Sequence, residues 1–390
     1  MSVVAAASLQ LLDWLRDREE QMTDLLARLV LAESPSLVPG SESAALGLLS
    51  AELERAGFRT RLLPGHKTGD HLFARPRARR QNDRYQLILG HVDTVWPLGT
   101  ARRHTGRDDG CFYGPGTYDM KGGLVQLVFA LAALDDLGLE PVLTPVVLVN
   151  SDEEIGSVDS ARYIRLLARR AARAFVLEPP AGPAGLLKTR RKGVERFEVV
   201  VTGRAAHAGT NPEEGVSAIL ELSRVVQELF ALNDVAHGVT VNVGTIDGGL
   251  RANVVAPEAT ALVDVRAPNE AAATAVAHAI RSLEPAKHGT TVTVRADAAR
   301  PPMQATDRNR ALFRRAQRLA RELGLRVEEA PLVGGASDAN LTSGLTATLD
   351  GLGAVGDGAH SPDEHVVVSA LPQRAALLAL LMLEDVLPNP

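Results

Sequence analysis

Three apolar, strand-like stretches in the first half of the chain each run directly into side chains that can bind a hard metal ion. The stretches cover 86–90, 146–151 and 174–177, and the polar residues that follow them are His91 and Asp93, Asp152 to Glu154, and Glu178. Short buried strands with such endings are typical of the carboxyl edge of a parallel sheet, where open α/β folds bind their ligands. The pattern predicts a metal-dependent enzyme.

The first of these endings pairs an imidazole with a carboxylate. His91 and Asp93 are two positions apart, so their side chains point to the same side of an extended segment. A carboxylate at the end of a buried strand needs a partner to offset its lost solvation. The pair therefore favours a functional role, although Asp93 could also simply bond to a nearby histidine or turn.

A glycine-rich turn at 114–123 holds one carboxylate, Asp119, at the start of an expected helix. The turn matches neither the phosphate-binding loop nor the dinucleotide fingerprint. Asp119 could be a metal ligand there, or it could be an ordinary helix N-cap.

The run from Asp152 to Glu154 is more specific. Three consecutive acids after a buried strand repel one another unless a cation or solvent relieves them. Because neighbouring side chains in a turning segment diverge, Glu154 could face a metal while Glu153 faces a water molecule that it activates. A solvated acidic loop is the alternative. Pro179 and Pro180 fix the turn after Glu178 and prevent a helix there.

The elements that must position these residues alternate between strand and helix. We expect helices at 8–31 and 42–57, strands at 71–75, 85–90, 143–150 and 174–177, and further helices at 120–138 and 157–170. This βαβ order is typical of a mostly parallel sheet. From about residue 195 the order becomes β-α-β-β-α-β. The sequence thus predicts an α/β catalytic domain, residues 1–193 and 301–390, with a ferredoxin-like insert at 194–300.

Composition narrows the class of protein. The chain has 390 residues, of which 45% are hydrophobic, so two folded domains are expected rather than disorder. Its net charge is -5 and its 42 basic residues are spread along the chain, which argues against a nucleic-acid partner. No apolar run approaches the roughly 18 residues of a membrane span. The single cysteine, Cys111, excludes an intrachain disulfide. We therefore expect a soluble, cytoplasmic protein without membrane partners.

Five motifs, in order along the chain, resemble the signature series of the di-zinc carboxypeptidase, aminoacylase and deacetylase family. They lie at 90–93, 114–123, 152–156, 177–179 and 356–364. Segments at 191–193, 203–209, 252–257, 264–266 and 334–339 are similar to its glutamate carboxypeptidase subgroup, the folate-hydrolysing glucarpidase type. Departures from that subgroup at 336–337 and 357–358 lie near the expected substrate pocket, and they could shift specificity away from folates.

The resemblance implies a catalytic domain of the zinc-exopeptidase type that binds two zinc ions, with cobalt or manganese also possible. The implied ligands are Asp119 as the bridge, His91 with Glu178 on one ion, and Glu154 with His360 on the other. Asp93 would orient His91, and Glu153 would act as the general base. The resemblance further implies a cis peptide bond between Asp119 and Met120.

The insert resembles a lid and dimerisation domain, which implies a homodimer. Its His207 would reach the partner subunit's active site and stabilise the oxyanion. Asn253 and Arg266 match lid residues that contact substrate, while Lys192 and Arg300 resemble cationic groups for substrate carboxylates. Each of these residues could alternatively be a surface charge or a core histidine.

The implied reaction is hydrolysis of an amide bond that releases a C-terminal amino acid, with glutamate as the leading candidate, from an N-acyl, peptidyl or folate-like substrate. An N-acyl amino acid amidohydrolase or deacetylase of broader specificity would use the same groups. A noncatalytic metal-bound dimer that serves as a binding protein is a third hypothesis. Glu153 argues against it, because a binding protein needs no base beside a metal ligand.

Overall fold

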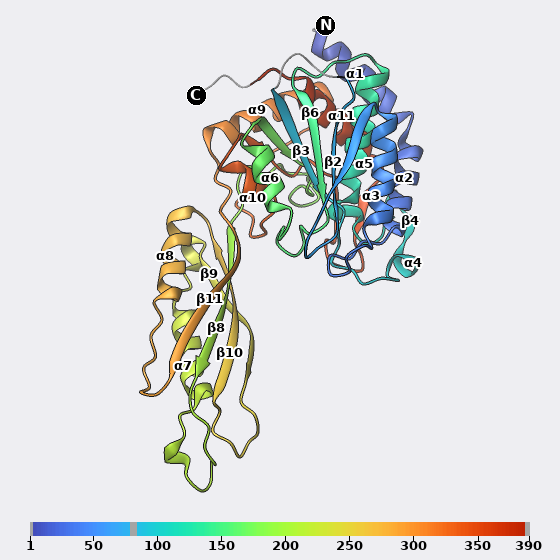
Figure 1. Ribbon diagram of the computed structural model, residues 1–390. Coiled ribbons are helices and arrows are strands. Elements are labelled where there is room, and N and C mark those ends of the chain that lie inside the picture. Colours follow the sequence, from blue (N-terminus) through green and yellow to red (C-terminus); the bar gives the residue numbers. More distant parts are fainter. Residues whose placement is uncertain (1–2, 79–83, 387–390) are drawn as a thin grey trace. The chain divides into compact units, whose positions relative to one another are not determined.

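The computed structural model describes residues 3–78 and 84–386, and the chain divides into two compact units (Figure 1). The first unit extends to Arg190, and it also contains Ala305–Val333 and the chain from Ser337 onward. The second unit comprises Arg191–Gln304 together with Gly334–Ala336. The insert expected at 194–300 lies within this second unit.

A six-stranded sheet forms the centre of the first unit. Its strands, in spatial order, are β1 (Phe58–Leu63), β2 (His71–Pro76), β6 (Thr144–Asn150), β3 (Tyr85–His91), β7 (Ala171–Val176) and β12 (Thr348–Leu349). Strand β2 runs antiparallel to its neighbours β1 and β6, whereas the other pairs are parallel. The expected α/β class with a mostly parallel sheet is confirmed.

Near the N-terminus one expectation is wrong, and one strand was missed. The single helix expected at 8–31 is two helices, α1 (Val3–Arg16) and α2 (Glu19–Leu31), because the backbone leaves the helical region at Arg18. Strand β1 was not expected. Only Phe58 of this strand is buried, and the exposed arginines of an edge strand hide the alternation that marks a half-buried strand.

Helices cover both faces of the central sheet. Helix α5 (Gly122–Asp136) packs against α11 (Ala370–Leu383), and both belong to one core with α1, α2 and α3 (Ser43–Arg55). Helix α6 (Ala161–Ala168) contacts β7 and α10 (Ala339–Ser343), and α9 (Asp307–Glu322) contacts α11 and β12. Burial on both faces explains the continuous apolar runs of β3 and β6. Among the described residues, no helix combines the length and apolar character that a bilayer crossing requires.

A second, small sheet in the first unit holds the segment around His360. Its strands, in spatial order, are β13 (Gly356–Asp357), β14 (His365–Val367), β5 (Cys111–Tyr113) and β4 (Gly106–Asp108). His360 lies in the connection between β13 and β14, and β5 leads into the turn that carries Asp119. Pairing of β14 with β5 therefore brings two distant segments of the chain together.

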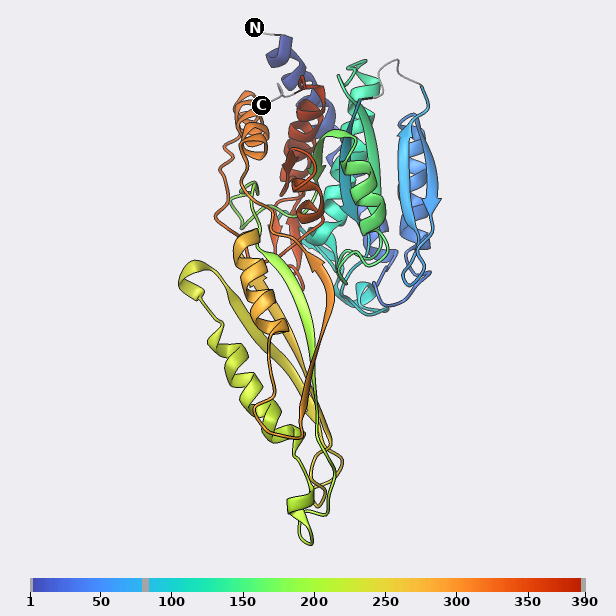
Figure 2. The ribbon, with the colours of Figure 1, turned by 60° about the vertical axis from the view of Figure 1, so that its left-hand side comes forward.

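The second unit is an antiparallel sheet with two helices on one face (Figure 2). Its elements, in chain order, are β8 (Gly193–Thr202), α7 (Ala218–Ala231), β9 (Thr240–Gly248), β10 (Glu258–Ala267), α8 (Glu270–Arg281) and β11 (Thr291–Arg300). The sheet order is β11-β8-β10-β9. Alternate residues of β8, namely Phe197, Val199 and Val201, face the helices and form a separate core with them. This chain order is the β-α-β-β-α-β order read from the sequence.

Candidate metal centre

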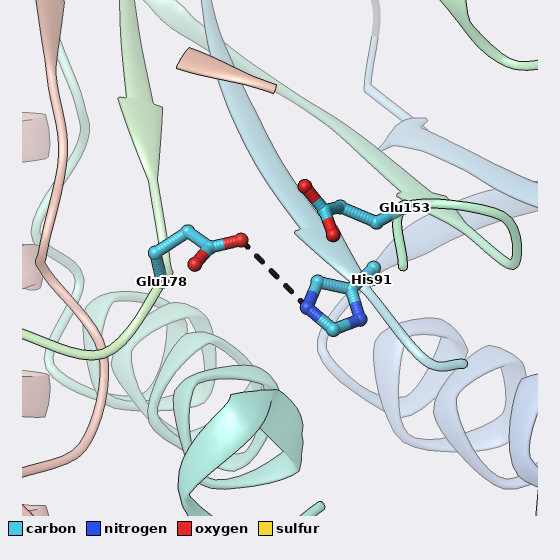
Figure 3. A group of neighbouring side chains, drawn as sticks. All are labelled: His91, Glu153 and Glu178. Atoms are coloured by element: carbon cyan, nitrogen blue, oxygen red, sulfur yellow. Dashed lines mark ion pairs between the residues drawn. The ribbon is translucent and has the colours of Figure 1, made fainter. Parts of the chain in front are cut away.

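Three neighbouring parallel strands end at one edge of the sheet and place imidazole and carboxylate side chains together (Figure 3). His91 is the last residue of β3, Glu153 and Glu154 lie in the turn after β6, and Glu178 follows β7. Because β3 pairs with β6 on one side and with β7 on the other, His91 lies between the two acidic segments.

Asp119 is the residue on which the remaining side chains converge. Its Oδ1 lies 3.1 Å from His91 Nε2, and its Oδ2 lies 3.6 Å from His360 Nε2. His91 Nε2 is also 3.7 Å from Glu178 Oε1, and His360 Nε2 is 3.2 Å from Glu154 Oε2. The site thus consists of two groups, each with one imidazole and one carboxylate of its own, and the two groups share Asp119.

Two glycines allow the Asp119 turn to lie against the strand ends. Gly116 has a φ of 74°, a left-handed conformation that glycine adopts without strain. A Cβ at Gly123 would lie 2.4 Å from the Leu177 carbonyl oxygen, so only glycine lets the start of α5 approach the end of β7 this closely. The peptide bond between Asp119 and Met120 is cis, as the family resemblance implies.

Asp93 connects His91 to the turn of Glu153 and Glu154. Its Oδ1 accepts a hydrogen bond from the Glu153 amide, and its Oδ2 accepts one from the Glu154 amide, both at 3.2 Å. The Asp93 backbone carbonyl lies 3.0 Å from His91 Nδ1. Because a carbonyl only accepts, Nδ1 carries the hydrogen, and in the neutral ring Nε2 presents its lone pair towards Asp119.

A residue that the sequence did not single out completes this arrangement. Ser36 Oγ donates a hydrogen bond of 2.6 Å to Asp93 Oδ2, and both side chains are buried. Ser36 lies in a loop far from Asp93 in the chain, and nothing in its local sequence signals the contact. Only the folded chain reveals that this hydroxyl fixes the orientation of the Asp93 carboxylate.

The donor set fits divalent cations. In the part of the chain that the structure describes, two groups of three side chains have ligand atoms within 4.8 Å of one another: His91, Glu153 and Glu178, and His91, Asp119 and Glu154. Carboxylate oxygens and imidazole nitrogens bind zinc, cobalt and manganese, and buried carboxylates this close together need positive charge beside them. The first group includes Glu153, which the sequence analysis treats as a base, so ligation and base catalysis must be separated by experiment.

The carboxylates change the proton affinity of the two imidazoles. Hydrogen bonds to Asp119 and Glu154 raise the pKa of His360 to about 10. Burial alone lowers the pKa of His91, but hydrogen bonds and charges from Asp119 and Asp93 outweigh burial and raise it well above its ordinary value. Because only a neutral imidazole nitrogen can ligate, a metal ion must displace these protons. Metal binding and proton release are therefore coupled at this site.

The residues expected to contact substrate belong to the second unit, where they form two groups. The basic group consists of Lys192, Arg266 and Arg300, and the His207 group consists of His207 and Asn253. Both Arg266 and Arg300 pair with Val194 near the start of β8. The His207 group lies in the loops beyond the opposite end of β8, where His207 bridges to Val254.

Arg266 already has a partner within the second unit. Its Nε and Nη2 donate to the Asp264 carboxylate at 2.7 and 3.1 Å, and its Nη1 donates to the Gly334 carbonyl at 3.3 Å. Binding of a substrate carboxylate by Arg266 would therefore require the guanidinium to share or exchange Asp264.

The ring of His207 has a defined tautomer. Its Nδ1 accepts hydrogen bonds from the amides of Gly209 at 3.1 Å and Thr210 at 3.0 Å. Since an amide only donates, Nδ1 carries no hydrogen, and the hydrogen of the neutral ring is on Nε2. The Asn253 carbonyl accepts from the Ala208 amide at 3.0 Å, which keeps the two loops together. An exposed Nε2–H is suited to hydrogen-bond an anionic oxygen.

The chain is similar to known proteins over most of its length. Residues 87–384 match the family described as Peptidase family M20/M25/M40. Carboxypeptidase G2 of Pseudomonas sp. (strain RS-16) is 31% identical over 380 residues, which cover 94% of this chain and 90% of that protein. A succinyl-diaminopimelate desuccinylase of Methylobacterium radiotolerans is 29% identical over 370 residues, which cover 89% of this chain and 93% of that protein. Among solved structures, a tripeptidase from Staphylococcus aureus has a TM-score of 0.76 at 21% identity, covering 93% of this chain and 97% of that one. This last likeness concerns the fold.

Proposed function

The chain belongs to peptidase family M20/M25/M40, and from this premise we propose that this hydrolase is a metal-dependent carboxypeptidase that releases a C-terminal amino acid, with glutamate as the leading candidate. The observation that carries the metal-dependent part is the position of Asp119. Its two carboxylate oxygens face two different imidazoles, and each imidazole faces a further carboxylate. Such an arrangement suits two adjacent cations.

In this proposal His91 and Glu178 would hold one cation, His360 and Glu154 would hold the other, and Asp119 would contribute to both. Zinc is the leading candidate, and cobalt or manganese would suit the same donors. When bound, the ions supply Lewis acidity that polarises the scissile carbonyl and makes water a stronger acid. The three carboxylates offset most of the positive charge of two divalent ions.

Glu153 is the residue proposed to move the proton. Its side chain is buried beside His91, and Figure 3 shows it reaching towards His91 from the turn after β6. Asp93 holds the backbone of this turn through the amides of Glu153 and Glu154, so the main-chain position from which the Glu153 side chain extends is fixed. Glu153 would take a proton from the attacking water and give it to the leaving amine.

The spacing of the basic group and the His207 group supports a homodimer. The stretch of β8 from Val194 to Thr202 separates them, which amounts to roughly 26 Å at about 3.3 Å per residue. A small substrate cannot touch both groups of one subunit. We propose that the His207 group serves the active site of the partner subunit, where Nε2 of His207 would stabilise the oxyanion.

Mixed dimers test this arrangement. Glu153→Ala and His207→Ala each inactivate the homodimer, but their heterodimer contains one site with an intact base and an intact histidine from the other chain. We expect purified heterodimers to recover about half of the activity of the wild-type dimer. As a control, the Glu153→Ala chain is paired with a chain that carries both substitutions, which should give no recovery. Heterodimers no more active than their parents, or a fully active monomer, would contradict the proposal.

A substrate panel tests the specificity. The wild-type protein, loaded with zinc, cobalt or manganese, is assayed on N-acyl amino acids, dipeptides, folate analogues and N-succinyl amines. We expect kcat/KM for a C-terminal glutamate to exceed that for neutral residues by about 10-fold to 100-fold, the range of one charged hydrogen bond. The Glu153→Ala protein controls for contaminating peptidases. Equal release of neutral residues would refute the preference for glutamate.

A broader N-acyl amidohydrolase is the second candidate. The similarity to succinyl-diaminopimelate desuccinylase over 89% of the chain favours it, because that relative's name describes removal of an N-succinyl group. An amidohydrolase of this kind would use the same proposed metal ligands and base as the carboxypeptidase. The fastest turnover with N-succinyl substrates in the panel would favour this candidate over the carboxypeptidase.

A further inference from the structure

Glu364 is a buried carboxylate that the proposed mechanism leaves without a role. Its side chain is almost fully enclosed, with 2% of the residue exposed. Its backbone directly precedes β14, and its carbonyl accepts from the Gly114 amide at 3.0 Å, just beyond the pairing of β14 with β5. The side chain therefore adds something beyond the pairing of β14 with β5.

All four hydrogen bonds of the Glu364 carboxylate come from donors in the loops around the metal centre. Oε1 accepts from the amides of Tyr118 and Asp119, each at 3.0 Å. Oε2 accepts from the Gly116 amide at 2.8 Å and from Trp96 Nε1 at 3.1 Å. One side chain thus holds the turn that carries the proposed bridging ligand, and it also holds the loop that follows Asp93.

The ammonium group of Lys121 interacts with Glu364 through its charge, but its hydrogen bonds are made to other groups. Lys121 lies in the same turn and is fully buried, but it donates to the carbonyl oxygens of Leu29 at 2.9 Å and Ala32 at 3.1 Å. The amides of the turn are therefore the groups that the Glu364 carboxylate satisfies. A buried acid with this pattern fixes backbone geometry rather than forming an ion pair.

We propose that Glu364 is a positioning residue for the metal centre, which fixes the Asp119 turn relative to the segment that carries His360 and so sets where the two cations are held. The two segments are far apart in the chain, and Glu364 follows His360 closely. Each of the two histidines faces a different oxygen of Asp119, so a small rotation of the turn would alter both groups at once. The inference rests on the proposed metal-dependent function.

The conservative variant Glu364→Gln tests the hydrogen bonds of the Glu364 carboxylate, because all four of its partners are donors. A glutamine amide can accept with its oxygen, but its NH2 group would face two of the four N–H groups and leave them unsatisfied. The volume of the side chain is nearly unchanged. A loss in this variant therefore reports on the hydrogen bonds and not on a cavity.

The test is a titration of metal-free protein with cobalt. Binding is monitored by calorimetry and by the visible absorption of the bound ion. We expect Glu364→Gln to bind cobalt about 10-fold to 100-fold more weakly than wild type and with an altered absorption spectrum. With the best substrate of the panel, we expect kcat to fall by a similar factor while KM changes little. Cobalt binding needs no substrate, so an error in the proposed substrate class leaves this result unaffected.

Glu42→Gln is the matched control. Glu42 is also buried and accepts from two amides, those of Gly40 at 2.7 Å and Asp70 at 3.0 Å, but it makes no hydrogen bond to a proposed metal ligand. This variant should lower Tm and leave cobalt binding unchanged. The positioning role is overturned if Glu364→Gln lowers Tm as Glu42→Gln does but keeps the cobalt affinity and spectrum of wild type.

If Glu364→Gln does not fold, Trp96→Phe gives the decisive measurement. It removes one of the four donors and keeps the carboxylate and its three amide partners. We expect cobalt affinity to fall by a few-fold in this variant. An affinity equal to that of wild type in folded Trp96→Phe would overturn the proposal in the same way.

Discussion

Replacing Glu153 with alanine should remove most turnover while leaving the metal content of the protein near that of wild type. We expect kcat to fall by about 10²-fold to 10⁴-fold, the range attributed to a general acid–base residue. The reason is that the proposed ligands, Asp119 among them, all remain in place in this variant. The measurements are kcat on the best substrate and metal content by elemental analysis after gel filtration.

A ligand role for Glu153 is the competing hypothesis. Glu153 lies close enough to His91 and Glu178 to share an ion with them, so a ligand role would also explain its position. Glu178→Ala is the matched comparison, because it removes a proposed ligand from the same group and should lower the metal content. Parallel losses of metal and activity in Glu153→Ala would show that Glu153 is a ligand and would remove it as the base.

The positions of the strand-end residues were predictable from the sequence. His91, Glu153 and Glu178 each follow an apolar run of strand length, and such runs in a βαβ order end at one edge of a sheet. Local pattern therefore indicated which residues converge there. It gave no reason for the position of His360, which came only from the resemblance to the family, because its segment belongs to the small sheet and not to the central one.

The contacts that hold these residues in place were not predictable. Ser36 and Glu364 act through hydrogen bonds to segments far away in the chain, and such partners are chosen by tertiary packing. A buried acid near the end of a motif was the only available signal for Glu364. The sequence therefore indicated the chemistry of the site better than the network that supports it.

The second unit shows a different limit of prediction from the sequence. Its chain order followed from the alternation of apolar residues, whereas the pairing of Arg266 with Asp264 was overlooked. These two residues lie two positions apart on β10, so their side chains share one face of the strand. The same rule that pointed to His91 and Asp93 applies here, and it makes Arg266 a weaker candidate for direct capture of a substrate carboxylate.

Replacing Asp119 with alanine should have an even larger effect than the loss of the base. Asp119 is the only proposed ligand whose two oxygens face both imidazoles, at 3.1 Å from His91 Nε2 and 3.6 Å from His360 Nε2. Its removal would weaken both proposed cation positions and would also remove the negative charge that faces both imidazoles. We expect kcat/KM to fall by more than about 10⁴-fold, with less than about one tightly bound ion per chain.

The comparison for this prediction comes from single-sided ligands, which are proposed ligands that face only one of the two imidazoles. Glu154→Ala and Glu178→Ala each affect one imidazole group, so each should retain about one ion per chain where wild type retains about two. Circular dichroism in the presence of a chelator should show that all three variants keep the fold. If Asp119→Ala retained as many ions as either single-sided variant, Asp119 would not be a bridge. The two imidazole groups would then have to bind their ions independently, and the mechanism proposed for this site would lose the feature that joins its two halves.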